Sequence, residues 1–116
     1  MDSNKFSYRL SNAAESDIDE IITYIAEDLG NPDAAQSFID EMIKRIEDLC
    51  EMPRIGNIVE NDLMDRNNII RILVHNHILY YFIDDQNRII NVMRVVYNRR
   101  DQFVILSSMM SDDLNH

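Results

Sequence analysis

The chain has 116 residues, of which 46% are hydrophobic and 28% are charged, and its formal net charge is −10. This composition is typical of one globular domain, and so negative a charge argues against indiscriminate binding of nucleic acid. The charge is unevenly divided. Residues 1–65 carry 5 Lys and Arg against 16 Asp and Glu, a balance of −11, whereas residues 66–111 carry 6 Arg against 3 Asp, a balance of +3. We therefore expect any polyanion or acidic partner to bind the second half.

The sequence gives no sign of a membrane or a secretory route. No apolar run approaches the roughly 18–20 residues of a membrane span, and the first residues lack the basic and apolar stretches of a signal peptide. We expect a cytoplasmic protein without a membrane partner. The single cysteine, Cys50, excludes an internal disulfide and falls in an apolar helical stripe, so we predict a buried structural side chain.

The first third of the chain predicts a strand followed by a helix. Residues 6–10 alternate apolar and polar side chains, as a half-buried strand does. Ser11 or Asn12 then offers a side-chain oxygen to cap a helix, and Gly30 is placed to end it in the left-handed conformation. The apolar stripe of this helix comprises Ile18, Ile21, Ile22, Ile25 and Leu29.

A second helix is predicted from Pro32 to the residue before Pro53. Asn31 is its cap, and proline is well tolerated at a first helical position. Two amphipathic helices with so short a link form an antiparallel hairpin. We expect a loop over 53–68, in which 59–64 could form one helical turn. The stripe of this helix comprises Ala35, Phe38, Ile39, Met42, Ile43, Ile46, Leu49 and Cys50.

Three further strands are predicted at about 69–75, 77–83 and 89–97. Short turns separate them, so neighbouring strands pair antiparallel. The order is β-α-α-β-β-β, which indicates an α+β fold: a four-stranded, mainly antiparallel sheet with the two-helix hairpin packed on one face. The other face is left free. We expect a single domain over 1–106 and a mobile tail over 107–116.

Four segments resemble the RelE/ParE superfamily, the small toxins of bacterial type II toxin–antitoxin modules that are also called plasmid stabilisation proteins. The resemblance covers about residues 6–106 and rests on the order and spacing of the segments together. The segments are YRLSNAAESDIDEIITYIAEDLG, NPDAAQSFIDEMIKRIEDLCEMPRIG with its Pro-x-x-Gly exit, IIRILVHNHILYYFIDD, and VMRVVYNRRD.

The resemblance implies a toxin that halts growth until a cognate antitoxin binds it in a hetero-oligomer. RelE-like members are endoribonucleases (mRNA interferases) that cleave mRNA in the ribosomal A site, so the ribosome and mRNA would be partners. ParE-like members poison DNA gyrase, which requires binding to a protein and no catalytic residues. A third alternative is an inactive module that only binds its antitoxin. The fold does not decide among these activities, and we favour mRNA cleavage as the expectation from sequence.

Cleavage of RNA without a metal requires acid–base groups and preorganised positive charge on the phosphate. The resemblance implies that Arg71, Arg99 and Arg100 contact the phosphate, as arginine forks pair two oxygens at once, and that Tyr97 stacks on a base or donates a proton. Each has a structural alternative. Arg71 could snorkel at a sheet edge, the two later arginines could pair with Asp101, and Tyr97 could be an amphipathic aromatic at a sheet edge.

Three more arginines are candidates for contacts with RNA or a partner: Arg94, Arg66 and Arg54. Arg94 falls in the middle of a predicted strand. Instead of contacting RNA or a partner, it could form a structural ion pair with a carboxylate of a helix. The acid–base set departs from the family pattern, because no lysine follows Lys44 and Val96 stands where the histidine of YoeB-like members falls. The remaining candidate bases are His75, His77, Glu60 and Asp101. We predict no metal site and no cofactor, since two histidines beside a turn point to opposite sides or to solvent.

Overall fold

The computed structural model describes residues 5–58 and 69–98, and these form eight elements in chain order. The first half holds strand β1 (Ser7–Leu10), helix α1 (Asn12–Thr23), the π-helical turn η1 (Tyr24–Asp28) and helix α2 (Pro32–Glu51). The second half holds strands β2 (Asn57–Ile58), β3 (Ile70–Val74), β4 (His77–Asp84) and β5 (Ile89–Tyr97). The α+β fold and its element order are those predicted from the sequence.

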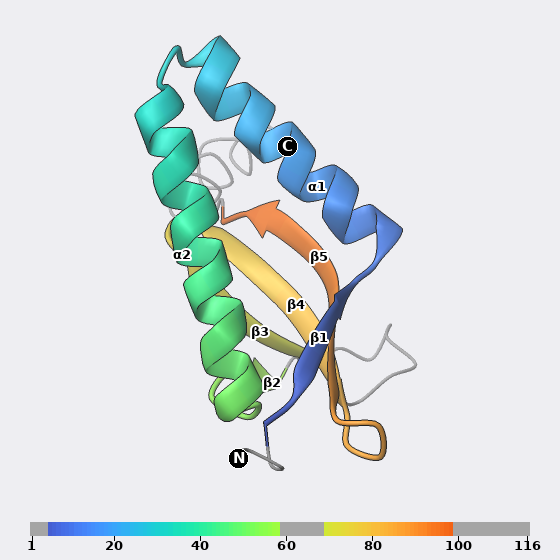
Figure 1. Ribbon diagram of the computed structural model, residues 1–116. Helices are drawn as coiled ribbons and strands as arrows, with labels where there is room; N and C mark the ends of the chain where they lie inside the picture. Colours follow the sequence, from blue (N-terminus) through green and yellow to red (C-terminus); the bar gives the residue numbers. More distant parts are fainter. Residues whose placement is uncertain (1–4, 59–68, 99–116) are drawn as a thin grey trace, which may run out of the picture.

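The strands form one sheet in the order β1-β5-β4-β3-β2, with both helices on one face of it (Figure 1). β1 pairs with β5 in parallel, and the other neighbours pair antiparallel. The four predicted strands are therefore all present, and the two-residue β2 adds a fifth at the edge of β3. β2 is too short to show the alternation of apolar and polar residues by which strands are predicted.

Helix α1 begins where Ser11 satisfies two backbone groups at once. Its hydroxyl accepts a hydrogen bond from Ala14 N at 2.9 Å, which caps the helix, and donates to the carbonyl of Met93 at 2.7 Å. The second bond ties the start of α1 to β5. Ser11, one of the two predicted caps, thus fixes both the start of the helix and its position on the sheet.

The link between the helices follows the predicted chemistry except at Leu29. Gly30 has a positive φ of 60°, and the Asn31 side chain accepts from Ala34 N at 3.0 Å ahead of Pro32. Leu29, however, is 58% exposed, although it was predicted to belong to the buried apolar stripe of the first helix. The cause is η1, because a π turn contains more residues than an α turn and so shifts the helical period by which Leu29 was assigned.

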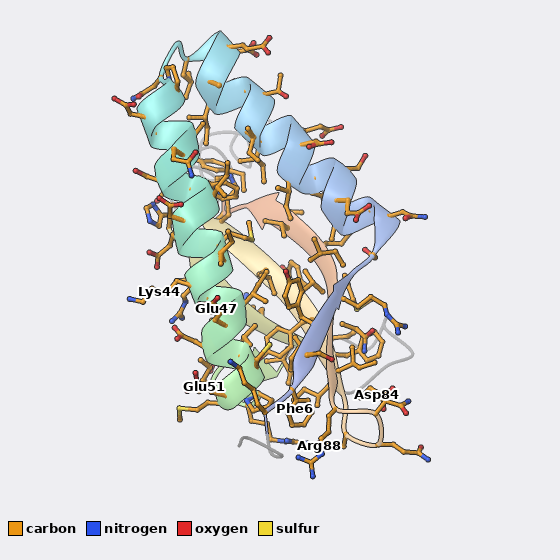
Figure 2. The ribbon with its side chains drawn as sticks, viewed as in Figure 1. Phe6, Lys44, Glu47, Glu51, Asp84 and Arg88 are labelled. Atoms are coloured by element: carbon orange, nitrogen blue, oxygen red, sulfur yellow. The ribbon has the colours of Figure 1, made fainter. Side chains whose placement is uncertain are left out.

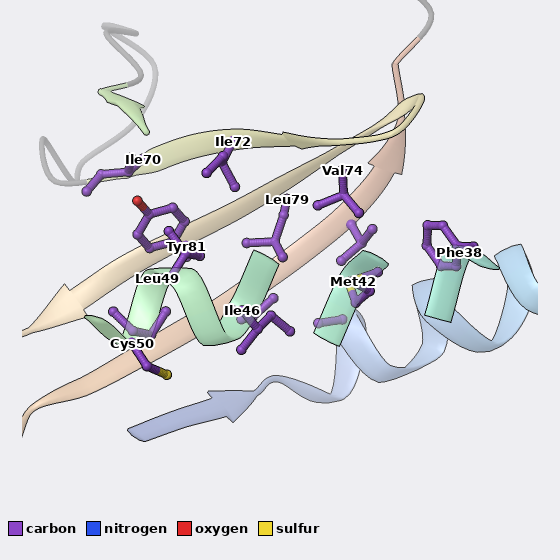
Figure 3. Close-up of a cluster of buried hydrophobic side chains, with 14 residues drawn as sticks. Phe38, Met42, Ile46, Leu49, Cys50, Ile70, Ile72, Val74, Leu79 and Tyr81 are labelled. Atoms are coloured by element: carbon purple, nitrogen blue, oxygen red, sulfur yellow. The ribbon is translucent and has the colours of Figure 1, made fainter. Parts of the chain in front are cut away.

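Helix α2 supplies the helical half of the core (Figure 3). Six of the eight predicted stripe residues are buried, but Ile43 is 50% exposed and Ile39 is half-buried. Cys50 is buried as predicted, and burial raises the pKa of its thiol. The sheet contributes alternate side chains that face the helices. The core residues shared by α2 and the sheet include Phe38, Met42, Ile46, Leu49, Ile72, Val74, Leu79, Tyr81, Ile90, Val92 and Val95.

The Pro-x-x-Gly exit of α2 closes around the phenol of Tyr81, which is fully buried in β4. The Tyr81 hydroxyl donates to the Pro53 carbonyl at 2.6 Å, and Gly56 N–H donates to the same phenol oxygen. Burial raises the pKa of this phenol. A Cβ on Gly56 would lie 2.5 Å from the carbonyl oxygen of Arg71. Gly56 is therefore required for the close approach of this loop to β3.

Candidate functional site

The face of the sheet away from the helices, here called the outer sheet face, is apolar in its centre. The register puts alternate residues of β3, β4 and β5 on it, and no helix covers it within residues 5–58 and 69–98. Leu73 is 54% exposed, and the β4 side chains on this face are half-buried. The residues on the outer sheet face include Arg9, Arg71, Leu73, Ile78, Tyr80, Phe82, Asn91 and Val96, and Arg94 lies in register with Tyr80 at the β5 edge.

Arg71 is the exposed cation on the β3 side of this face. It lies directly opposite Tyr80 of β4 and shares its side of the strand with Leu73. Ile69, just before the strand, is buried. No other described residue hydrogen-bonds or ion-pairs with the Arg71 guanidinium. Arg71 therefore offers a charged group beside an aromatic ring.

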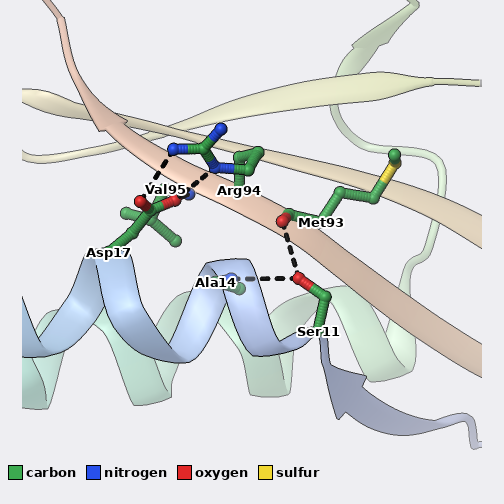
Figure 4. Close-up of polar contacts among 6 residues, drawn as sticks. All are labelled: Ser11, Ala14, Asp17, Met93, Arg94 and Val95. Atoms are coloured by element: carbon green, nitrogen blue, oxygen red, sulfur yellow. Dashed lines mark hydrogen bonds and ion pairs between the residues drawn. The ribbon is translucent and has the colours of Figure 1, made fainter.

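Arg94, by contrast, is already paired. Its guanidinium donates to both carboxylate oxygens of Asp17 on α1, at 2.7 and 2.9 Å (Figure 4). The carboxylate also accepts from Val95 N at 3.0 Å. The hydrogen bonds from Arg94 are the main cause that lowers the pKa of Asp17. The ion pair with a helix carboxylate, considered from the sequence, is thus confirmed.

Asp17 and Ser11 together complete the edge of β5 beyond the end of β1. β1 pairs with β5 only as far as Val92, where Leu10 lies opposite. The next backbone groups of β5 find partners on α1: Met93 C=O accepts from Ser11 and Val95 N–H donates to Asp17. Buried strand edges need such partners. Arg94 therefore belongs to a structural contact between α1 and β5.

Tyr97 lies at the end of β5 against a buried histidine. It is 42% exposed and is paired in register with His77, at the start of β4. The two rings meet edge to face with their centroids 5.5 Å apart, and Phe38 of α2 packs against the other side of His77 at 4.9 Å. His77 is 9% exposed, and its Nδ1 has no hydrogen-bond partner among the described residues.

Arg71 and Tyr97, two predicted members of one catalytic set, lie on opposite faces of the sheet. Arg71 pairs with Tyr80, which lies three residues after His77 on β4. Side chains alternate along a strand, so an odd separation reverses the face. His77 and Tyr97 face the helices, whereas Arg71 faces away. The two side chains therefore do not converge on one reacting atom.

The remaining candidates divide into paired residues and residues outside the described ranges. Arg54 donates to Asp85, in the turn after β4, at 2.6 Å, and both side chains are more than 60% exposed. His75 lies 3.7 Å from Glu41 of α2. The described residues contain no group of three side chains suited to hold a metal ion. Arg66, Arg99, Arg100, Glu60 and Asp101 fall outside the described residues, as do the optional turn at 59–64 and the tail at 107–116.

The solvent side of the helical hairpin carries most of the acidic residues. Glu47 and Glu51 project from α2 beside Lys44 (Figure 2). None of the helices in the described part of the chain is long and apolar enough to cross a membrane. Most of the described carboxylates therefore lie on the helices, whereas Arg71 lies on the sheet.

The solved structures that share this fold include the following two. One is the toxin–antitoxin complex RelBE2 from Mycobacterium tuberculosis, which is 18% identical with a TM-score of 0.57; the match covers 80% of this chain and 98% of that one. The other is the chromosomal ParDE toxin–antitoxin system from P. aeruginosa, which is 13% identical with a TM-score of 0.63; the match covers 82% and 98% of the two chains. No curated protein matches the chain in sequence.

The sequence itself carries a family signature. Residues 8–102 match the family described as the ParE toxin of the type II toxin–antitoxin system parDE. The match runs from the second residue of β1 to beyond the end of β5. The chain therefore belongs to the ParE toxin family of type II toxin–antitoxin systems.

Proposed function

We propose that this chain is the toxin of a type II toxin–antitoxin module, that a cognate antitoxin neutralises it by binding, and that the free toxin arrests growth by binding a protein target. Membership in the ParE toxin family supports the first two parts. DNA gyrase is the target that a ParE-like activity implies. Such an activity needs a complementary surface and no acid–base residues.

The observation that carries the choice of mechanism is the separation of Arg71 and Tyr97 on opposite faces of the sheet. A nuclease needs its phosphate-binding cation and its proton donor within reach of one substrate bond. The outer sheet face instead combines an apolar centre with the exposed guanidinium of Arg71, which pairs with no other described residue. Surfaces of this kind, with aromatic residues and arginine, are enriched in protein interfaces.

Induced expression in bacteria tests the toxin role. We expect growth arrest, relieved when the product of the neighbouring open reading frame is co-expressed and binds the chain. Purified protein should then inhibit gyrase supercoiling while mRNA stays intact. Normal growth after induction of a folded protein would contradict the toxin role. Tight binding to the neighbouring product with neither activity would identify an inactive antitoxin-binding module.

Ribosome-dependent mRNA cleavage is the second candidate function. The position of Arg71 relative to Tyr80 favours it. The exposed guanidinium of Arg71 lies opposite the ring of Tyr80. An arginine can pair with a phosphate while a neighbouring aromatic ring stacks on a base. If this face holds mRNA in the ribosomal A site, toeprinting on translating ribosomes will show A-site cleavage.

Arg71→Ala separates the two candidates when it is compared with Lys44→Ala. Both changes remove one exposed positive charge, but Lys44 lies on the solvent side of α2 (Figure 2). A nuclease should lose A-site cleavage with Arg71→Ala and keep it with Lys44→Ala. A gyrase poison should give no cleavage product with any variant, and Arg71→Ala should weaken supercoiling inhibition. Equal effects of the two variants would mean that net charge, and not the outer sheet face, matters.

A further inference from the structure

His77 is an unusual core residue because one of its polar atoms is buried without a partner. Its side chain is 9% exposed, and no described residue hydrogen-bonds to Nδ1. Buried polar atoms in folded proteins are nearly always hydrogen-bonded, and an exception calls for an explanation. The cost of an unpaired neutral nitrogen is modest, whereas an unpaired buried charge is far more costly.

The imidazole joins elements that are distant in the chain. It is held between Phe38 of α2 and Tyr97 of β5, with centroid distances of 4.9 and 5.5 Å and interplanar angles of 60° and 70°. β4, which carries His77, lies between β3 and β5 in the sheet. The ring therefore packs at the junction of the helical layer with the end of the sheet, and an uncharged ring suits two aromatic neighbours.

The charged groups near this junction do not stabilise a proton on His77. From α2, Glu41 lies within 3.7 Å of His75 instead. From the turn between β3 and β4, His75 repels a second positive charge. From β5, the neighbour is the ring of Tyr97. Burial, and to a smaller extent His75, lowers the pKa of His77.

We propose that His77 is a proton-operated latch: as a neutral imidazole packed between them it joins Phe38 of α2 to Tyr97 of β5, and protonation releases this junction. The released state exposes the imidazole to water, where it can carry its charge. Local opening would free the end of β5 while the rest of the core stays packed, since stability differs between parts of a fold. This regulation concerns the fold and does not depend on the target of the toxin.

The sign of the pH effect follows from the lowered pKa of His77. The unfolded or opened state binds the proton more readily than the closed state, so stability is greatest above the ordinary pKa of about 6.5 and falls as the pH drops below it. Carboxylates, with ordinary pKa values near 4, stay ionised over most of this range. Acidification from about pH 7.5 to about pH 5.5 therefore acts mainly on histidine.

Hydrogen exchange on the purified full chain tests the latch at these two pH values. After correction for the intrinsic rate, we expect protection of the amides of Ile78 and Val96 to fall on acidification in the wild type. His77→Phe, whose uncharged ring cannot titrate, should keep its protection. His75→Gln, which changes the exposed histidine of the same turn, should retain most of the wild-type response.

A second measurement keeps the test decisive if His77→Phe does not fold. In an NMR titration of the wild type, the His77 imidazole should protonate below the ordinary histidine range, together with shifts in the Phe38 and Tyr97 ring signals. Titration of His77 at an ordinary value would overturn the proposal. So would a pH response of His77→Phe equal to that of the wild type.

Discussion

Gly56 lies at a close approach of the loop after α2 to β3, where an added Cβ would be 2.5 Å from the carbonyl oxygen of Arg71. It sits against β3 while its N–H donates to the Tyr81 phenol, and an added Cβ would also lie 2.7 Å from Cγ2 of Ile70. The glycine needs no unusual backbone angle to be essential here, since close approach alone excludes a side chain. The Pro-x-x-Gly motif thus has a physical purpose: it fits the exit of α2 around a buried hydroxyl.

Gly56→Ala should lower the free energy of unfolding by about 1–3 kcal/mol, because the extra methyl group forces β3 and the loop apart. Urea denaturation followed by circular dichroism measures the change. Ile55→Ala, in the same segment but 39% exposed, serves as the control and should change stability by about 0.5 kcal/mol or less. Equal losses in the two variants would contradict the role assigned to Gly56.

Asp17→Asn should lower the free energy of unfolding at neutral pH by about 1–3 kcal/mol, because the Arg94 guanidinium and the Val95 N–H lose a charged acceptor that is 12% exposed. The lowered pKa of Asp17 means that this stability is present above about pH 3.9 and is lost as the pH falls through the folded value. Denaturation at a series of pH values measures both effects.

Asp19→Asn is the matched control for this acid response, since Asp19 lies exposed on the same helix. It should leave both the neutral stability and the acid dependence nearly unchanged. If the two variants respond alike to acid, the Arg94 pair does not carry the effect.

At the scale of single residues, the sequence could suggest types of contact but not partners. A helix carboxylate near Arg94 was foreseeable, yet nothing in the pattern singles out Asp17, which lies 77 positions away. The partners of His77 could not be predicted from the sequence either. The alternation of β4 decides that it faces the helices, and only the register with β5 brings Tyr97 against it. Arg71 was expected to share a site with Tyr97, but the register separates them.

At the scale of elements, the sequence predicted helix starts and ends correctly where these depend on contacts between residues close together in the chain. Ser11, Gly30, Asn31 and Pro32 each act within a few residues of their own position, and all four behave as predicted. The π turn η1 and the strand β2 carry no such signal. η1 lies between α1 and the link to α2, and β2 is defined only by its pairing with β3.

Ser11→Ala should lower the free energy of unfolding by about 1–2 kcal/mol, since it removes the helix cap and the bond to Met93 together. Thermal unfolding and exchange of the amides in the first turn of α1 measure the loss. Ser7→Ala is the control, because the Ser7 hydroxyl makes only a long 3.5 Å bond to the Arg88 carbonyl. A larger effect at Ser7 would contradict the joint role of Ser11.

At the scale of the whole molecule, acidic helices lie over a sheet that carries Arg71 and Arg94. The net charge of −10 leaves excess negative repulsion within the folded chain. The fold class and the layers followed from sequence, because patterning and short connections restrict a β-α-α-β-β-β chain to few arrangements. The parallel pairing of β1 with β5 did not, since no local residue of β1 specifies its neighbour.

Salt should therefore stabilise the protein. Raising the ionic strength from about 0.05 M to about 0.5 M shortens the Debye length to a few ångströms and screens repulsion among the exposed carboxylates. We expect the melting temperature to rise by several degrees, equivalent to roughly 1 kcal/mol. Differential scanning calorimetry in NaCl measures the shift, with sucrose at equal osmolality as a control for solute effects. A fall in melting temperature would mean that ion pairs such as Asp17–Arg94 outweigh the repulsion.

The pairing of β1 with β5 has a consequence for how the protein is made. Ser7 lies opposite Ile89, so the first strand finds its neighbour only after more than eighty residues have been joined. Contacts this distant in sequence form late and slow folding. A growing chain leaves the ribosome N-terminus first, and it must present α1 and α2 without the strand that anchors them until β5 has emerged. The sheet can therefore close only after β5 has been made, so α1 and α2 spend the earlier part of synthesis without their full strand partners.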